Sequence, residues 1–112
     1  MSIKITLLKS GETVISDAKE LISEDRPCGY LLRNPHNIKV EYDKQILLTE
    51  ENEPAGSDVR VTFSNWIPLT EEKEIAIPTD WVVTIVEPIE TIKKMYEEKI
   101  NEQNSKVSNS QN

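Results

Sequence analysis

The side chains best suited to nucleophilic chemistry in this chain are one cysteine and one histidine, Cys28 and His36. An imidazole can activate a thiol by accepting its proton, and the two groups need to be adjacent only in space. Cys28 follows Pro27 at the start of an expected strand, where a lone cysteine more often packs as a small hydrophobic residue. His36 stands in the turn-forming segment 34–37, Asn-Pro-His-Asn, and is more often a polar turn residue. A Cys28–His36 enzyme is therefore the weakest of the hypotheses that we consider.

Other kinds of catalytic or cofactor site lack the necessary residues. The three glycines are isolated, so the sequence has no glycine-rich phosphate loop. The acidic run at 50–53 does not have the spacing of a calcium loop, and one cysteine with one histidine cannot complete the usual structural zinc site. The carboxylates fall in expected loops and on an expected helix, without the apolar neighbours that would raise a pKa. We therefore expect no enzyme activity, no cofactor and no metal.

A small group of side chains could bind single-stranded RNA, which is held by stacking on aromatic or arginine planes inside a basic rim. The group consists of Arg26, Tyr30, Arg33, His36 and Lys39. The net charge of −7 argues against a general nucleic-acid coat, although screening over about 8–10 Å leaves a local site open. Tyr30 is more often a core or interface residue, and the same holds for Trp66 and Trp81.

The length of 112 residues indicates one domain, large enough for a single core without disulfides. Apolar alternation and turn residues predict short strands through the first three quarters of the chain. The expected strands cover 3–7, 13–22, 30–32, 38–49, 59–63, 75–77 and 81–86. Residues 50–58 read as a solvated acidic loop. No apolar run approaches a membrane span and no secretory signal is apparent, so we expect a cytoplasmic protein with no membrane partner.

The last expected strand is apolar on both faces. Trp81, Val83 and Ile85 lie on one face, and Val82 and Val86 lie on the other. A strand with one face in water does not have this pattern. Either another element of the chain or a neighbouring subunit must cover it, and edge strands pair readily with other chains.

A helix is expected after this strand. Pro88 fits the first turn of a helix, and Ile89, Ile92, Met95 or Tyr96, and Ile100 form one apolar stripe. We place the helix at 89–103, after a β domain at 1–88, and we assign 104–112 to a disordered tail.

Residues 75–88, Ile-Ala-Ile-Pro-Thr-Asp-Trp-Val-Val-Thr-Ile-Val-Glu-Pro, resemble the second signature of the Sm-like (LSm) family. Residues 8–14, with Gly11 in the turn, resemble the opening of the first signature. The chain is also similar to small Sm-like proteins encoded by tailed phages of marine cyanobacteria, which places it in the host cytoplasm if it is phage-encoded. The resemblance implies an all-β fold: a five-stranded, strongly bent barrel, here with a C-terminal α-helix. It also implies a homo-oligomeric ring, in which the last strand of one subunit pairs with the fourth strand of the next. The residues expected at the subunit interface are Val59, Val61, Phe63, Trp81, Val82, Val83, Ile85 and Val86.

The RNA-binding residues of the Sm-like family are only partly retained. Asp25 keeps the acidic position, while 27–29 replace the aromatic, Met and Asn residues and Pro78-Thr79 replaces the Arg-Gly corner. Our first hypothesis is a non-catalytic ring that binds single-stranded RNA in a processing or regulatory role. Its binding residues would be Asp25, Arg26, Tyr30, Arg33, His36, Lys39 and Thr79. The alternative is a scaffold ring that has lost RNA binding and presents the acidic loop and the helix to a basic or apolar protein partner.

Overall fold

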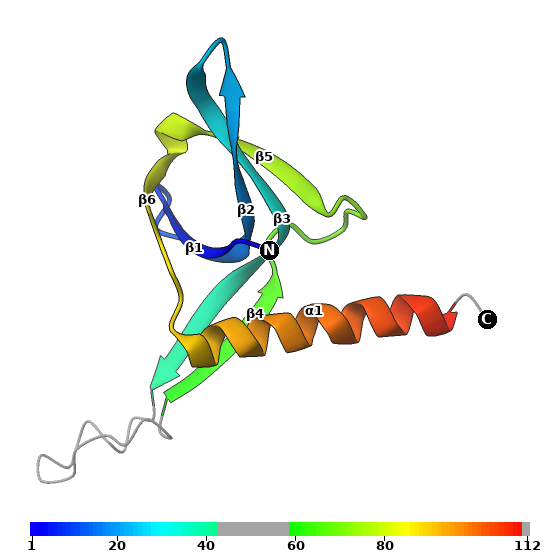
Figure 1. Cartoon of the computed structure of the whole chain (residues 1–112). Helices are drawn as coiled ribbons and strands as arrows, with labels where there is room; N and C mark the ends of the chain where they lie inside the picture. Colours follow the sequence, from blue (N-terminus) through cyan, green and yellow to red (C-terminus); the bar gives the residue numbers. More distant parts are fainter. Residues whose placement is uncertain (43–58, 111–112) are drawn as a thin grey trace, which may run out of the picture.

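The computed structural model describes residues 1–42 and 59–110, and the side chains of 1–41 and 60–103. These residues form one antiparallel sheet and one long helix (Figure 1). The strands are β1 (Ile3–Leu8), β2 (Thr13–Ser23), β3 (Arg26–Tyr42), β4 (Val59–Asn65), β5 (Glu74–Pro78) and β6 (Val82–Val86). A 3-10 turn, η3 (Thr79–Trp81), joins β5 to β6, and the helix is α1 (Glu90–Ser110). Among the described residues, no helix is both long enough and apolar enough to span a bilayer.

The sheet is open and has six strands in the described residues, so the expected closed barrel of five strands is wrong in these two respects. Its order is β4-β3-β2-β1-β6, and β5 pairs with β3. One edge of β3 is occupied by β2. The other edge must therefore be shared by β4 and β5. The register runs from Tyr42↔Val59 to His36↔Asn65 in β4, and from Arg33↔Glu74 to Gly29↔Pro78 in β5. The two strands are thus halves of one strand, interrupted by residues 66–73.

Strand β3 runs through the segment 34–37, where the sequence predicted an interruption. Asn34 takes a left-handed conformation with φ 52°, which asparagine tolerates better than most residues. Opposite it, the β2–β3 register shifts between Ile15 and Asp17. The turn-forming residues therefore bend the strand and do not end it, because His36 and Asn37 pair with β2 on one edge and with β4 on the other. Residues 43–49 of the strand expected at 38–49, and the acidic loop at 50–58, lie outside the described residues.

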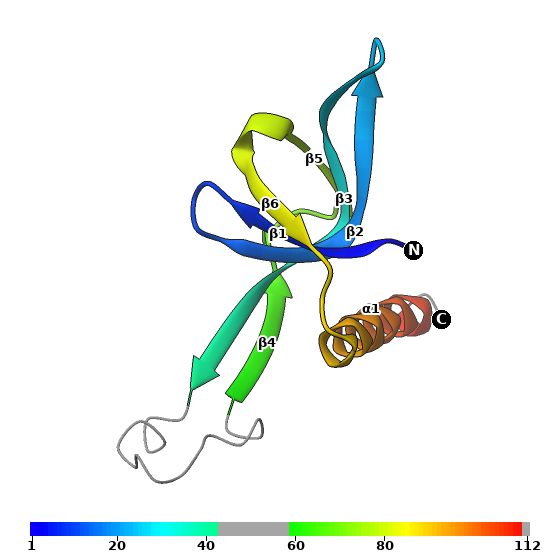
Figure 2. The ribbon, with the colours of Figure 1, turned by 60° about the vertical axis from the view of Figure 1, so that its left-hand side comes forward.

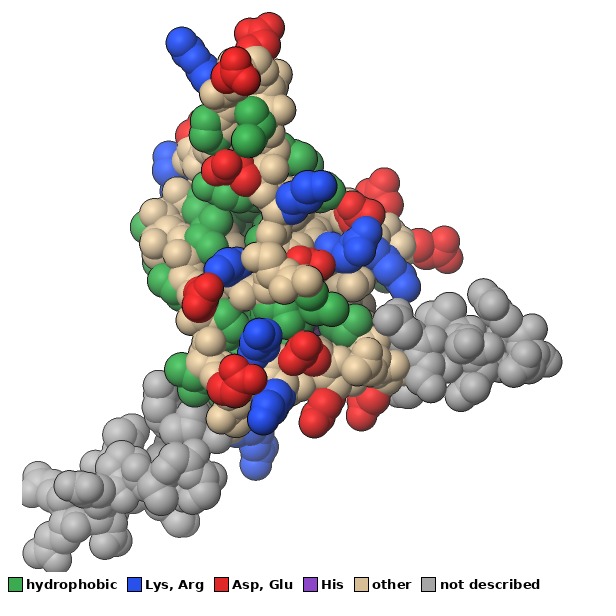
Figure 3. Space-filling model, viewed as in Figure 1, with side chains coloured by type: hydrophobic (Ala, Val, Ile, Leu, Met, Phe, Trp, Pro, Cys, Tyr) green, Lys and Arg blue, Asp and Glu red, His purple; other side chains and the backbone are tan. Residues whose placement is uncertain are grey.

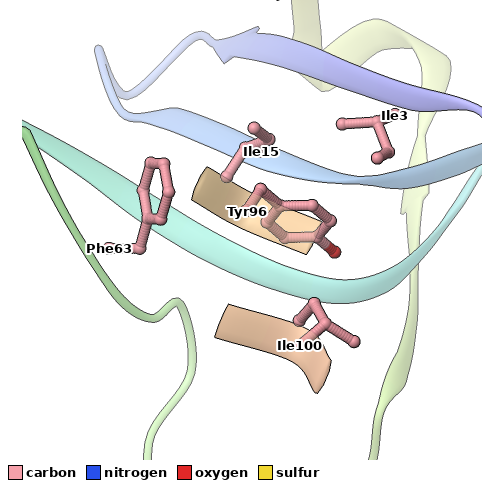
Figure 4. Close-up of a cluster of buried hydrophobic side chains, with 5 residues drawn as sticks. All are labelled: Ile3, Ile15, Phe63, Tyr96 and Ile100. Atoms are coloured by element: carbon pink, nitrogen blue, oxygen red, sulfur yellow. The ribbon is translucent and has the colours of Figure 1, made fainter. Parts of the chain in front are cut away.

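The two faces of the sheet contribute to separate buried clusters. One cluster lies against the helix, where Tyr96 and Ile100 of α1 pack on Ile3, Ile15 and Phe63 (Figure 4). The other lies on the opposite face and consists of Leu8, Val14, Leu32 and Ile77. Both faces of β2 are therefore buried near its start, where the consecutive residues Val14, Ile15 and Ser16 are all fully buried.

Helix α1 crosses the sheet on the side away from the β2–β3 hairpin (Figure 2). It begins at Glu90, so Pro88 precedes its first turn, and it continues to Ser110. It therefore includes residues 104–110, which the sequence analysis assigned to a disordered tail. Among the described side chains of the helix, Ile92, Met95, Tyr96 and Ile100 form the apolar stripe that anchors it.

Candidate functional site

The segment between β4 and β5, which we call the 66–73 loop, is closed at its base by two backbone hydrogen bonds. Trp66 N–H donates to the Pro35 carbonyl at 3.2 Å, and Asn34 N–H donates to the Lys73 carbonyl at 2.7 Å. The loop thus leaves the sheet and returns to it at the bend of β3. Compact loops whose ends lie close together are frequently functional.

A pocket of about 520 Å³ lies between this loop, the bend of β3 and the helix. Its floor is formed by Pro35 and His36, which are buried. Asn34, Ile75 and Gln103 are half-buried within it. The rim is exposed and consists of Asn65, Ile67, Thr70, Glu71, Glu72 and Lys73. The volume falls within the range of about 300–1,000 Å³ that is usual for small-molecule sites.

His36 is fixed in one tautomer by its two neighbours. Its Nδ1 lies 2.8 Å from the Asn34 carbonyl oxygen, which can only accept, so Nδ1 carries the proton. Its Nε2 then accepts from the Gln103 amide at 3.4 Å. Burial lowers the pKa of His36, the nearby Lys99 acts in the same direction, and the bond to Asn34 opposes them. The floor of the pocket therefore carries a neutral imidazole at neutral pH.

Tyr96 ties the helix to the same point of the sheet. Its hydroxyl donates to the carbonyl of Asn34 at 2.8 Å, and the carbonyl of Arg33 is a second acceptor at 3.2 Å. Its ring packs edge-on against that of His36, with 5.8 Å between the ring centroids. Burial raises the pKa of the Tyr96 phenol, so it remains a donor at any physiological pH. The strained backbone of Asn34 is thus held by Lys73, His36 and Tyr96 together.

The residues expected to bind nucleic acid do not form one site, because β3 separates them into two groups. Asp25 and Arg26 are exposed at the tip of the β2–β3 hairpin, where Glu24 and Asp25 both have positive φ. Thr79 lies on the same side of the bend as this group, because its neighbour Pro78 pairs with Gly29 near the start of β3. Tyr30 packs on the cluster around Leu32, in agreement with the interpretation as a core tyrosine.

The second group lies at and beyond the bend, and its basic side chains have carboxylate partners. Arg33 bonds Glu74 at 3.3 Å and Lys39 bonds Glu41 at 3.2 Å, so a phosphate would have to compete with these ion pairs. His36 is buried in the pocket. Cys28 is exposed and eight residues away along β3, about 26 Å at the usual rise per residue, so the structure does not bring the thiol and the imidazole together.

The expected interface residues also divide into two groups. On β6 and η3, Trp81, Val83 and Val86 are 44%, 58% and 49% exposed, and Val82 and Ile85 are half-buried. On β4, Phe63 belongs to the core of the subunit itself and Val61 packs against it, while the side chain of Val59 lies outside the described residues. In Figure 3, hydrophobic side chains reach the surface along the side of the molecule where β6 lies.

Residues 1–101 of the chain match a family of unknown function, DUF6561. The chain belongs to this family. No protein in the curated collection matches it. The family match covers the whole sheet and every residue of the pocket except Gln103.

The pocket was not anticipated from the sequence. The segment 34–37 was recognised as turn-forming, but it is far along the chain from residues 65–75, which form the opposite side of the pocket. Only the pairing of β3 with both β4 and β5 brings them together. One signal that could have indicated the loop is the short spacing between the apolar run at 59–63 and that at 75–77, which suits two halves of one strand.

Proposed function

We propose that the chain is a non-catalytic, Sm-like assembly module that forms a ring by pairing its β6 edge with a second copy. The proposal rests on the pairing and the exposure of β6. It pairs with β1 and with no other strand of the described chain, and none of its residues is buried. An apolar edge that the chain itself leaves open is an efficient template for pairing with another copy.

The order of elements supports the Sm-like part of the proposal. A strongly bent meander of β1, β2 and β3 is followed by the interrupted strand β4–β5, the turn η3 with Asp80, and the apolar strand β6. The last part of this order, a strand, a turn with Asp80 and a final apolar strand, is what the resemblance of 75–88 to the second Sm signature implies. The 66–73 loop accounts for the additional strand, because it divides the fourth strand in two.

The two open edges of the sheet are unlike, which favours head-to-tail pairing. In the described residues, β6 forms one end of the sheet, and β4 and β5 pair only with β3. Pairing of β6 with the β4–β5 edge of the next copy is a heterologous contact, which gives a ring when the rotation closes. Closure would cover the open edge of β6 and part of the β4–β5 edge at once.

Val83→Asp tests the assembly, because this side chain is already 58% exposed in the single subunit and a change there spares the core. Burying an unpaired carboxylate between copies is strongly unfavourable, so we expect the variant to have a lower native mass by light scattering with unchanged circular dichroism. Ile22→Asp is the matched control, since Ile22 is 64% exposed on the distant β2–β3 hairpin. The proposal fails if the wild-type protein is monomeric, or if Val83→Asp retains the wild-type mass.

The distribution of charge favours a protein-scaffold role for the ring. The hairpin tip places Glu24 and Asp25 beside Arg26, and Arg33 and Lys39 are already paired with carboxylates. The described surface mixes acidic and basic side chains without a large basic area in this view (Figure 3). A basic or apolar protein segment suits such a surface better than a phosphate backbone does.

Binding of single-stranded RNA is the second candidate, and the exposed Arg26 and the nearby Thr79 favour it. Counterion release requires that such binding weaken as salt is raised. Fluorescence anisotropy with U-rich, A-rich and mixed oligonucleotides should therefore show binding at low salt that Arg26→Ala reduces. Absence of binding to all three at low salt would exclude this candidate and leave the scaffold role.

A further inference from the structure

Apart from His36, the residues that line the pocket between the 66–73 loop and α1 are neither among the expected interface residues nor among the expected RNA-binding residues. Two non-glycine residues have left-handed backbones here: Asn34, which lines the pocket, with φ 52°, and Leu69, which belongs to the 66–73 loop without lining the pocket, with φ 68°. For a bulky leucine this conformation is a genuine outlier. Leu69 is also fully exposed, and Ile67 on the same loop is 44% exposed. Strain and exposed apolar side chains concentrate at ligand sites, where they are retained for function.

We propose that this pocket binds an uncharged nucleobase or nucleoside. The first reason is the set of lining residues that carry a carboxamide side chain, Asn34, Asn65 and Gln103. Both ring nitrogens of His36 are already used, by the Asn34 carbonyl and by Gln103, so the imidazole orients Gln103 and does not itself bind the ligand. A carboxamide offers a donor and an acceptor in one plane, which matches the paired donors and acceptors on the edge of a base. Gln103 uses one N–H for His36 and keeps another N–H and its carbonyl oxygen for a ligand.

The second reason is the shape and chemistry of the walls. Pro35 forms part of the buried floor, and Ile67 and Ile75 contribute apolar side chains from the loop and from β5. These surfaces suit the faces of a planar ring, while the carboxamides meet its edge. The volume of about 520 Å³ is sufficient for a nucleoside.

The third reason is charge, which disfavours a nucleotide relative to a nucleoside. Glu71 and Glu72 outnumber Lys73 among the lining residues, and the chain as a whole has a net charge of −7. A phosphate would be repelled by the two carboxylates, whereas ribose hydroxyls are common partners of acidic side chains. Glu71 and Glu72 are therefore assigned to the sugar and the carboxamides to the base.

Isothermal titration calorimetry on the full chain tests this site with adenosine, guanosine, cytidine and uridine at concentrations up to about 1 mM. We expect at least one nucleoside to bind, and its 5′-monophosphate to bind more weakly because of the acidic rim. Gln103→Ala and Asn65→Ala should each weaken binding about tenfold or more, because a base edge loses its partner. Asn101→Ala is the control, since Asn101 is exposed on the same helix and does not line the pocket.

Circular dichroism establishes that each variant is folded before it is titrated. The proposal is overturned if none of the four nucleosides binds to the folded wild-type protein. It is also overturned if Gln103→Ala and Asn65→Ala bind as tightly as Asn101→Ala, or if the monophosphate binds more tightly than the nucleoside. Val83 does not line the pocket of its own subunit, but the pocket lies at the β4–β5 edge to which β6 of a second copy would pair. The titration is therefore repeated with the Val83→Asp variant, whose binding of the nucleoside tests the pocket apart from the ring.

Discussion

At the scale of single residues, the backbone of Asn34 connects three parts of the molecule. Its N–H donates to Lys73 of the loop, and its carbonyl accepts from His36 of the same strand and Tyr96 of the helix. A non-glycine residue with positive φ costs of order 1–3 kcal/mol, and three hydrogen bonds at one residue are a plausible compensation. The bend of β3 is therefore set by contacts that are distant in sequence.

His36 should make the stability of the protein depend on pH near neutrality. Burial lowers its pKa in the folded state, so below its unfolded value of 6.5 the unfolded chain binds the proton first. Stability is fully present above pH 6.5 and falls as the pH decreases, by at most about 1.4 kcal/mol per pH unit until the lowered folded pKa is reached. Denaturant unfolding at pH 7.5, 6.5 and 5.5 measures this slope.

His36→Gln is the matched variant, because the chain has no other histidine. It should be less stable at pH 7.5, where it loses the fixed imidazole contacts. Its free energy of unfolding should also change much less than that of the wild type between pH 7.5 and 5.5. Equal slopes for the two proteins would show that the imidazole is not buried as described.

At the scale of elements, the close approach of β3 and β5 depends on the lack of a side chain at Gly29. An added Cβ there would lie 2.4 Å from the backbone oxygen of Ile77, which cannot move without separating the two strands. We expect Gly29→Ala to cost about 1–3 kcal/mol, the usual range for overpacking. Hydrogen exchange should accelerate at 75–77, and unchanged protection of these amides would contradict the close contact.

Helix α1 should stabilise the fold through its apolar stripe. Ile100 is 8% exposed and packs with Tyr96 against Ile3, Ile15 and Phe63. Ile100→Ala should reduce the free energy of unfolding by about 2–4 kcal/mol, through lost transfer energy and a cavity. The exposed neighbour Asn101 serves as control, and Asn101→Ala should remain within about 0.5 kcal/mol of the wild type in urea unfolding. Similar small losses for both would mean that the helix is not anchored at this position.

The elements also show which features local sequence can determine. The alternation in 3–7 and 59–63 and the stripe through Ile92 and Ile100 correctly indicated two strands and a helix, because burial of one face repeats with a fixed period. The segment 34–37 was expected to interrupt the strand, but pairing on both edges of β3 converts the break into a bend. The division of the fourth strand and the pocket behind it depend on long-range register, which no local pattern contains.

At the scale of the whole molecule, the sheet ends in two edges of different character. The β6 edge carries exposed Val83 and Val86, and the other edge belongs to a strand in two parts. The difference between the two edges constrains the symmetry of the assembly. A two-fold dimer would join identical edges, whereas joining unlike edges requires at least three copies for closure.

Light scattering distinguishes these arrangements. Head-to-tail closure predicts a native mass that is a fixed multiple of 12.8 kDa, with a factor of about three or more, and that stays constant over a tenfold range of protein concentration. A mass that grows continuously with concentration would indicate an open filament, in which the rotation between copies does not close. A stable mass of two chains would mean that β6 pairs with β6, and the unlike edge at β4 and β5 would then need another partner.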